Sequence, residues 1–147
     1  MSGSFVAKSE ITVDVSPEAV WRALTDPEMV SQYMYGTVME TSWEVGSPIT
    51  WSGEWEGKSY QDKGTVLDVV PQRRLMMTYW SSMSGRADQP ENYLTVTYEL
   101  AETEGGVKLT LTQDNNASQE EADSMAERNW GPVLKSLKAA AEARGEL

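Results

Sequence analysis

The feature that most constrains the fold is an alternation of apolar and polar side chains that recurs through residues 37–115. Ile49, Trp51 and Trp55 fall on one face of an extended segment, and polar residues fall on the other. A period of two, repeated over successive segments, is typical of an antiparallel sheet covered on one side. Glu104-Gly105-Gly106 predicts a hairpin turn between two such segments. The pattern therefore predicts a curved antiparallel sheet with bulky rings on one face.

The segment before this region predicts one more strand and two short helices. Residues 6–15 alternate as a half-buried strand. Ser16-Pro17 then supplies a helix N-cap and a proline at the first helical position. Thr25-Asp26-Pro27 ends this short helix and begins a second, which ends near Gly36.

The segment after it predicts a long C-terminal helix. Residues 118–121 form a capping box, and the apolar periodicity continues towards Gly145. Gly131-Pro132 predicts a kink rather than a break, because proline cannot donate to the carbonyl of Arg128. We therefore expect an α+β fold in which about seven antiparallel strands wrap around this helix, with the two short helices between the first and second strands.

Composition limits the classes of function. The 147 residues suit one domain, residues 1–147. No apolar run is long enough for a membrane helix, and the polar first ten residues lack a signal core, so we expect a soluble cytoplasmic protein. A net charge of −11 without a basic tract argues against nucleic-acid and anionic-membrane partners. The absence of histidine and cysteine excludes histidine-dependent triads, thiol nucleophiles and zinc thiolates.

Three segments, taken together in their order and spacing, carry a family resemblance. They are residues 16–27, 64–75 and 129–137. The chain resembles the SRPBCC superfamily (START-like, birch-pollen-allergen-like) over about residues 5 to 143, and within it the branch named for the activator of the heat-shock chaperone ATPase. The resemblance implies a helix-grip fold with a deep cavity between the sheet and the last helix. Members hold lipids, polyketides or hormones there, and some are cyclases or dehydratases.

Alternation and helical periodicity direct one set of side chains into the space between sheet and helix. These residues could contact an apolar ligand, or their rings could fill an ordinary core. Gln113 and Asn115 could hydrogen-bond a ligand or cap strand and helix ends. The candidate ligand-binding residues are Trp51, Trp55, Met77, Tyr79, Tyr98, Leu111 and Gln113 on the sheet, Met125, Trp130 and Leu134 on the helix, and Tyr33 and Met34 at one end.

Evidence for catalysis is thin in the sequence. The pattern contains no paired inward carboxylates and no metal-ligand spacing, so the catalytic residues are unknown and neither a metal nor a cofactor is predicted. Asp68 lies on a strand that alternates poorly, and Arg86 lies in the long loop of residues 81–92. A buried acid within hydrogen-bond reach of Tyr79 or Tyr98 would favour an enzyme.

Three hypotheses follow. The leading one is a protein that binds or carries a hydrophobic small molecule, either a lipid or an aromatic, polyketide-like compound. The second is a cyclase, dehydratase or hydrolase that acts on such a molecule. The third is a chaperone-interacting domain of the stress response. A homodimer could form through exposed Trp80 or Trp43.

Overall fold

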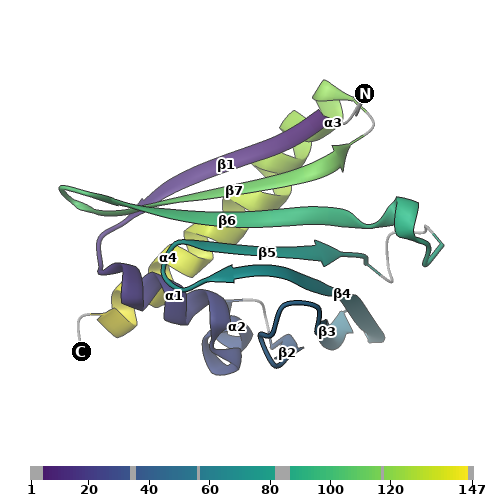
Figure 1. Ribbon diagram of the computed structural model, residues 1–147, viewed down its shortest axis with the longest axis horizontal. Helices are drawn as coiled ribbons and strands as arrows, with labels where there is room; N and C mark the ends of the chain where they lie inside the picture. The colour runs from purple at the N-terminus through teal and green to yellow at the C-terminus, as the bar shows by residue number, and fades with distance from the viewer. Residues whose placement is uncertain (1–4, 34–35, 56, 82–86, 117, 146–147) are drawn as a thin grey trace.

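The computed structural model describes residues 5–33, 36–55, 57–81, 87–116 and 118–145. A seven-stranded sheet in the order β1-β7-β6-β5-β4-β3-β2 forms its main layer (Figure 1). Every neighbouring pair of strands is antiparallel, which confirms the predicted sheet. The strands are β1 (Phe5–Val13), β2 (Val38–Glu40), β3 (Pro48–Trp55), β4 (Lys58–Val70), β5 (Arg74–Tyr79), β6 (Leu94–Thr103) and β7 (Gly106–Asn116).

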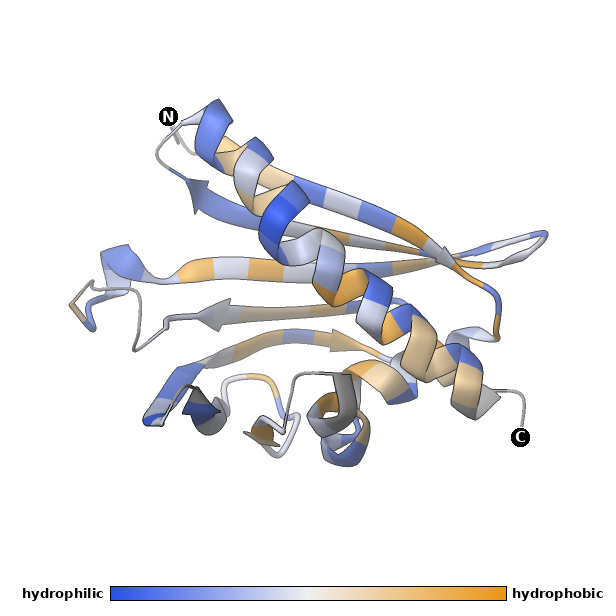
Figure 2. Ribbon diagram, turned by 180° about the vertical axis from the view of Figure 1, so that it is seen from behind, coloured by the Kyte–Doolittle hydropathy of each residue, from blue (hydrophilic) through white to orange (hydrophobic). Residues whose placement is uncertain are grey.

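The helices cover one face of this sheet, and the C-terminal helix crosses the strands diagonally (Figure 2). The predicted N-caps are confirmed, because Ser16 Oγ accepts the Ala19 N–H at 3.2 Å and Ser118 Oγ accepts the Glu121 N–H at 3.0 Å. The helical elements are α1 (Pro17–Thr25), α2 (Pro27–Tyr33), the short 3-10 turn η1 (Pro90–Asn92), α3 (Gln119–Met125), the π-helical turn η2 (Ala126–Trp130) and α4 (Gly131–Gly145).

The C-terminal helix continues through Gly131-Pro132 without a break, as the sequence predicted. Gly131 keeps right-handed helical angles of φ −55° and ψ −53°, and its N–H donates to the Ala126 carbonyl, five residues back. The departure from α-helical geometry is thus a π turn directly before the proline. Ser9 on β1 also donates to the Ala126 carbonyl at 2.8 Å, which ties this turn to the sheet.

The core lies between the helices and the covered face of the sheet. The predicted alternation places Ile49, Leu109 and Leu111 on this face, and all three are fully buried. Leu134 and Leu137 of α4 pack into the same cluster. Regular strands and the long helix therefore bury the residues that their periodicity predicts.

Asp68, whose direction the sequence left ambiguous, lies on the outer side of the sheet. The register between β4 and β5 shifts between Val66 and Asp68. This irregularity interrupts the alternation, as a β-bulge does. The Asp68 carboxylate accepts hydrogen bonds from the Arg74 guanidinium, with N–O distances of 2.7 and 2.9 Å. Asp68 is therefore part of a surface ion pair and does not face the core.

The expectation that Trp43 and Trp80 are exposed is wrong, because both side chains are half-buried. Trp43 Nε1 donates to the Thr25 carbonyl at 3.2 Å. Trp80 stacks on Tyr93 with ring centroids 6.4 Å apart, and the Lys63 ammonium lies 5.8 Å from its ring centroid. Each indole therefore packs against its own chain and does not project from the surface towards a second copy.

Candidate functional site

Two hollows of different character lie at opposite ends of the space between the sheet and the helices. One, which we call the inner cavity, has a volume of about 40 Å³ and lies where α1 and α2 cover the sheet. The other, which we call the amide pocket, has a volume of about 220 Å³ and lies beside α3, where β5 and β7 end and β6 begins. The inner cavity is lined by Leu24, Val30, Met39, Trp43, Trp51, Leu75, Met77 and Tyr98.

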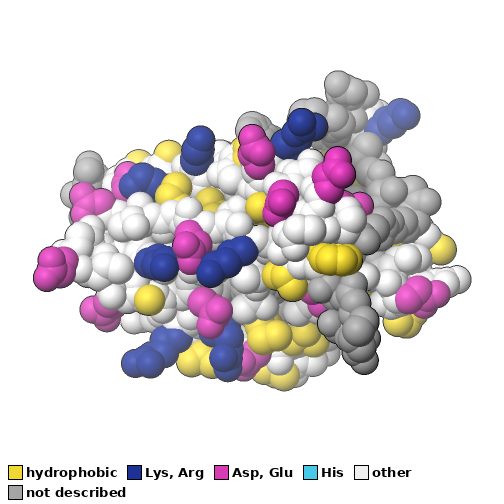
Figure 3. Space-filling model, turned by 90° about the horizontal axis from the view of Figure 1, so that it is seen from above, with side chains coloured by type: hydrophobic (Ala, Val, Ile, Leu, Met, Phe, Trp, Pro, Cys, Tyr) yellow, Lys and Arg dark blue, Asp and Glu magenta, His cyan; other side chains and the backbone are white. Residues whose placement is uncertain are grey.

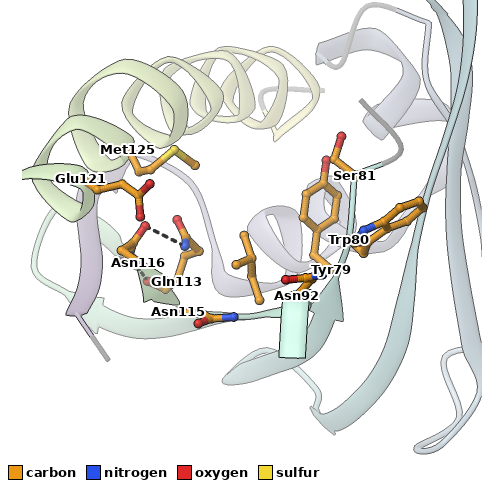
Figure 4. Close-up of a pocket in the computed structure, with 10 residues that line it drawn as sticks. Tyr79, Trp80, Ser81, Asn92, Gln113, Asn115, Asn116, Glu121 and Met125 are labelled. Atoms are coloured by element: carbon orange, nitrogen blue, oxygen red, sulfur yellow. Dashed lines mark hydrogen bonds between the residues drawn. The ribbon is translucent and has the colours of Figure 1, made fainter. Parts of the chain in front are cut away.

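Both apolar and polar side chains line the amide pocket (Figure 4). Leu94, Met125 and the ring of Tyr79 supply apolar surface. Its remaining lining residues are Trp80, Ser81, Asn92, Gln113, Asn115, Asn116 and Glu121. Such a mixture of apolar surface with a few placed polar groups is typical of small-molecule sites.

Gln113 is a deeply buried polar residue of the amide pocket, and only 1% of its surface is exposed. Its Oε1 accepts the indole N–H of Trp130 at 2.9 Å. Its Nε2 donates to the Asp114 carbonyl at 2.5 Å and to Asn116 Oδ1 at 3.1 Å. Because buried polar groups are costly without partners, this network holds the end of β7 against the C-terminal helix.

The other amides join the end of β7 to neighbouring segments. Asn115 has a left-handed backbone, with φ 62°, and its Nδ2 donates to the carbonyls of Glu91 (2.9 Å) and Tyr93 (3.1 Å). Asn116 Nδ2 donates to the Phe5 carbonyl at 2.9 Å and to the Gln113 carbonyl at 3.2 Å. Asparagine adopts left-handed angles more readily than most residues, so this irregular strand end suits the sequence.

A buried carboxylate lies behind Tyr79. The Tyr79 hydroxyl donates to Asp62 Oδ2 at 2.7 Å, and Asp62 is 9% exposed. The Tyr79 ring meets the Trp51 ring edge to face, with centroids 5.2 Å apart. Burial, followed by the charge and the hydrogen bond of Asp62, raises the pKa of Tyr79 far above its ordinary value of 10.0. The phenol therefore stays protonated and acts as a hydrogen-bond donor to Asp62.

Asp62 reaches this position because β4 and β5 approach closely at Gly64. A Cβ at Gly64 would lie 1.8 Å from the Thr78 carbonyl oxygen, so only glycine allows this approach. Just beyond, Lys63 pairs with Trp80 in an isolated bridge. Asp62 and Tyr79 each precede one member of that pair, and both point into the space under the helices.

The predicted site residues fall into three groups. Tyr79, Gln113 and Met125 line the amide pocket, whereas Trp51, Met77 and Tyr98 line the inner cavity, where burial raises the pKa of Tyr98 to about 12. Leu111, Trp130 and Leu134 are buried core residues that line neither hollow. The backbones of Tyr33 and Trp55 end α2 and β3, while Met34 and Arg86 lie outside the described residues.

Sequence reasoning missed Asp62 and Asn116. Asp62 shares its face of β4 with the buried Gly64 and Val66, so its parity with these two residues could have found it. Asn116 follows Asn115, whose left-handed backbone interrupts the regular strand. A strict alternation therefore does not predict that Asn116 is buried. Asn92, Glu121, Ser81, Leu94 and Trp80 were also absent from the predicted lining.

Three observations bear on other classes of function. No helix within the described segments is long and apolar enough to cross a membrane. Among those same residues, no three acidic side chains gather as a metal site would require. On the face seen from above in Figure 3, basic and acidic side chains are interspersed. Ion pairs of the molecule show the same mixing, since Lys8 and Lys108 both pair with Glu10.

Comparisons with known proteins agree with this architecture. The sequence model of the family described as "Activator of Hsp90 ATPase homolog 1-like protein" matches residues 14–142. The solution structure of ChR145 from Cytophaga hutchinsonii is similar at 38% identity and a TM-score of 0.82, with 97% of each chain covered. NE0264 from Nitrosomonas europaea has the same fold at 19% identity and a TM-score of 0.78, again over 97% of each chain. A search of the curated proteins finds no match.

One further similar structure is that of DynU16, described as a protein in the dynemicin biosynthetic locus. It has 17% identity and a TM-score of 0.76. The match covers 95% of the present chain and 48% of DynU16. At that identity the likeness concerns the fold.

Proposed function

The chain belongs to the Activator of Hsp90 ATPase homolog 1-like family, and from that premise we propose that it binds a small, largely apolar molecule in the amide pocket. The observation that carries this proposal is the pocket itself. It offers apolar surface from Leu94, Met125 and Tyr79 beside buried amides that are already held in place by hydrogen bonds. A site whose polar groups are fixed before binding loses little free energy in ordering them.

The volume limits the size of the ligand. A cavity of roughly 150 Å³ accepts benzene, and drug-sized sites measure roughly 300–1,000 Å³. At about 220 Å³ the amide pocket lies between these values. It therefore suits a molecule with one ring and a short polar chain better than a long acyl chain. Of the two ligand classes that the sequence suggested, an aromatic compound fits better than a lipid.

The test is a titration of the ¹⁵N-labelled protein with 4-phenylbutanol, followed by two-dimensional NMR. Burial of apolar surface contributes roughly 25 cal/mol per Å², so a fragment of this size is expected to bind with a Kd of about a millimolar or below. The indole N–H of Trp130 and the side-chain amides of Gln113 and Asn116 should shift as the pocket fills.

A matched pair of variants makes this test specific. Met125→Trp places an indole in the pocket and should abolish the shifts. Leu67→Trp places the same side chain on the outer face, where Leu67 is exposed, and should leave them unchanged. Equal loss in both variants, or no shift in the unaltered protein, would refute binding at this site.

The buried Asp62 carboxylate favours an enzyme as the second candidate function. It meets the criterion of an acid within hydrogen-bond reach of Tyr79. Two facts weigh against it: Asp62 does not itself line the amide pocket, and the Tyr79 hydroxyl already donates a hydrogen bond to Asp62. A hydrolase would cleave p-nitrophenyl esters, and Asp62→Asn would abolish that turnover while the 4-phenylbutanol shifts persist. Interaction with a chaperone and self-association remain predictions from the sequence.

A further inference from the structure

We infer that the amide pocket selects ligands that donate hydrogen bonds, above all a primary ammonium on a one-ring body, and rejects carboxylates and phosphates. This inference rests on the proposed function, because it concerns the kind of molecule that the same pocket would hold. It follows from the observation that most side-chain hydrogen-bond donors of the pocket already bond to acceptors within the protein.

The amide donors are engaged within the protein. Both N–H groups of Gln113, of Asn115 and of Asn116 have partners, as described above. Asn92 Nδ2 donates to the Ala87 carbonyl at 2.8 Å. An amide whose N–H groups are engaged in this way can meet a ligand through its oxygen, which accepts and cannot donate.

The orientation of each amide follows from partners that have only one role. The Ala87, Glu91, Tyr93, Phe5 and Asp114 partners are backbone carbonyls, which only accept. The indole of Trp130 only donates, so Gln113 must present its oxygen to it. Rotating any of these side-chain amides by 180° would place its oxygen against a carbonyl oxygen or its NH₂ group against the indole N–H. The hydrogen bonds therefore fix which side of each amide is the donor.

The remaining donors of the pocket are few and neutral. The Tyr79 hydroxyl proton is engaged with Asp62. Ser81 hydrogen-bonds Tyr79, which acts to lower the Tyr79 pKa against the larger effects of burial and Asp62 that raise it. The indole of Trp80 completes the side-chain donors among the described lining residues. No combination of these can neutralise an anionic headgroup.

The charges around the pocket act in the same direction. Glu121 belongs to the lining, and the described lining residues include no lysine or arginine (Figure 4). Lys63 lies over the Trp80 ring, but its ammonium is ion-paired with Asp88. The whole chain carries a net charge of −11. An anion that enters would lose hydration and gain no cation from the described lining residues, whereas an ammonium would meet carboxylate and amide oxygens.

The test compares three compounds with the same phenylbutyl body, namely 4-phenylbutylamine, 4-phenylbutanol and 4-phenylbutyrate, each titrated at pH 7 by two-dimensional NMR. We expect the amine to bind tightest, the alcohol several-fold more weakly, and the carboxylate at least tenfold more weakly than the alcohol. A carboxylate that binds as tightly as the alcohol would overturn this inference and leave the proposed function intact. If none of the three shifts the Trp130 indole signal, the proposed function itself fails.

Two pairs of variants separate a property of the pocket from general attraction to an acidic protein. Glu121→Gln removes a charge at the pocket and should narrow the preference for the amine over the alcohol several-fold. Glu127→Gln removes the same charge from an exposed position on η2 and should not change that preference. Equal effects would show that the preference comes from net charge, and would contradict the inference.

The second pair supplies a cation. Met125→Lys places an ammonium in the pocket and should improve 4-phenylbutyrate binding at least tenfold relative to 4-phenylbutanol, whereas Met125→Gln, of similar length, should not. Unaltered selectivity in a folded Met125→Lys variant would contradict the inference.

Discussion

The two ends of the space between sheet and helix differ in how they are filled. At the end beneath α1 and α2, rings and aliphatic side chains leave only about 40 Å³ of empty space. At the end beside α3, hydrogen-bonded amides join the end of β7 to neighbouring segments, and about 220 Å³ stays empty. Strands β5 and β6 border both hollows, whereas α1 and α2 border the inner cavity and α3 borders the amide pocket. The side chains also differ, since apolar groups can collapse onto each other, whereas hydrogen-bonded amides keep fixed distances.

This contrast suggests that one end of the space contributes mainly to stability and the other mainly to binding. The side chains around the inner cavity pack tightly, which favours stability. The side chains around the amide pocket pack less tightly and leave an accessible space. Stability is distributed unevenly in many proteins, and binding regions are drawn from the less stable parts. The contrast can be tested by changing equivalent residues at the two ends.

The largest expected effect comes from truncating one leucine at each end. Leu75 is fully buried against the inner cavity, and Leu75→Ala should lower the free energy of unfolding by about 2–5 kcal/mol. Leu94, on the adjacent strand β6, is half-buried and borders the amide pocket, so Leu94→Ala should cost only about 1 kcal/mol. Urea denaturation measures both. Equal losses would remove the distinction between the two ends.

The next effect concerns the hydrogen bonds of Gln113 in the amide pocket. Gln113→Leu keeps roughly the same shape but leaves the Trp130 indole N–H and Asn116 Oδ1 without their partner. An unsatisfied buried group costs about 1–3 kcal/mol, so the variant should lose stability by that order. Adding Trp130→Phe should recover part of the loss, because it removes the indole N–H that was left without an acceptor.

Gln119→Leu is the matched control for this prediction. Gln119 is exposed at the start of α3 and hydrogen-bonds Asp123 at 2.8 Å. Its replacement should change the free energy of unfolding by less than about 0.5 kcal/mol. If Gln113→Leu were equally mild, the amides would contribute little to the shape of the pocket.

How much of this could be predicted from the sequence depends on the regularity of the backbone. Ile49, Trp51 and Leu111 were placed correctly because they lie on regular strands, where the period of two holds. Ser16 and Ser118 were placed correctly because helix caps depend on nearby residues only. These features account for the fold and for the set of inward-facing residues.

The candidate site was predicted less well because it lies where regularity ends. The left-handed Asn115 and the register shift between Val66 and Asp68 disturb the alternation. The pairing of Asp62 with Tyr79 depends on a close approach of two strands at Gly64, which local patterns do not encode. The inward-facing residues were also predicted to form one site. Their division into two hollows depends on how the helices pack, which the sequence pattern does not indicate.

The smallest expected effect concerns the far end of α4, which fastens the C-terminal helix to β1 beyond the inner cavity. Lys138 Nζ donates to the Thr12 carbonyl at 3.0 Å and pairs with Glu142, whose Oε2 also accepts the Asp14 N–H at 2.9 Å. The hydrogen bond from Lys138 and that from Asp14 lower the pKa of Glu142 from its ordinary value of 4.5. A carboxylate with a lowered pKa stabilises the folded state above the pKa it has in the unfolded chain, and that contribution is lost as the pH falls through the folded value.

Glu142→Gln should therefore lower the free energy of unfolding by less than about 1 kcal/mol at pH 7, as is usual for a surface ion pair. The gap between this variant and the unaltered protein should stay constant down to about pH 5 and close below 4.5, because protonation of Glu142 then weakens the same contacts. Glu127→Gln, on the exposed side of the π turn beside the amide pocket, is the matched control at the other end of the helix. Urea denaturation between pH 3 and pH 7 measures the gap for both variants. A gap for Glu142→Gln that widened on acidification would have the wrong sign for this ion pair, and would contradict a stabilising role for the ionised Glu142 carboxylate.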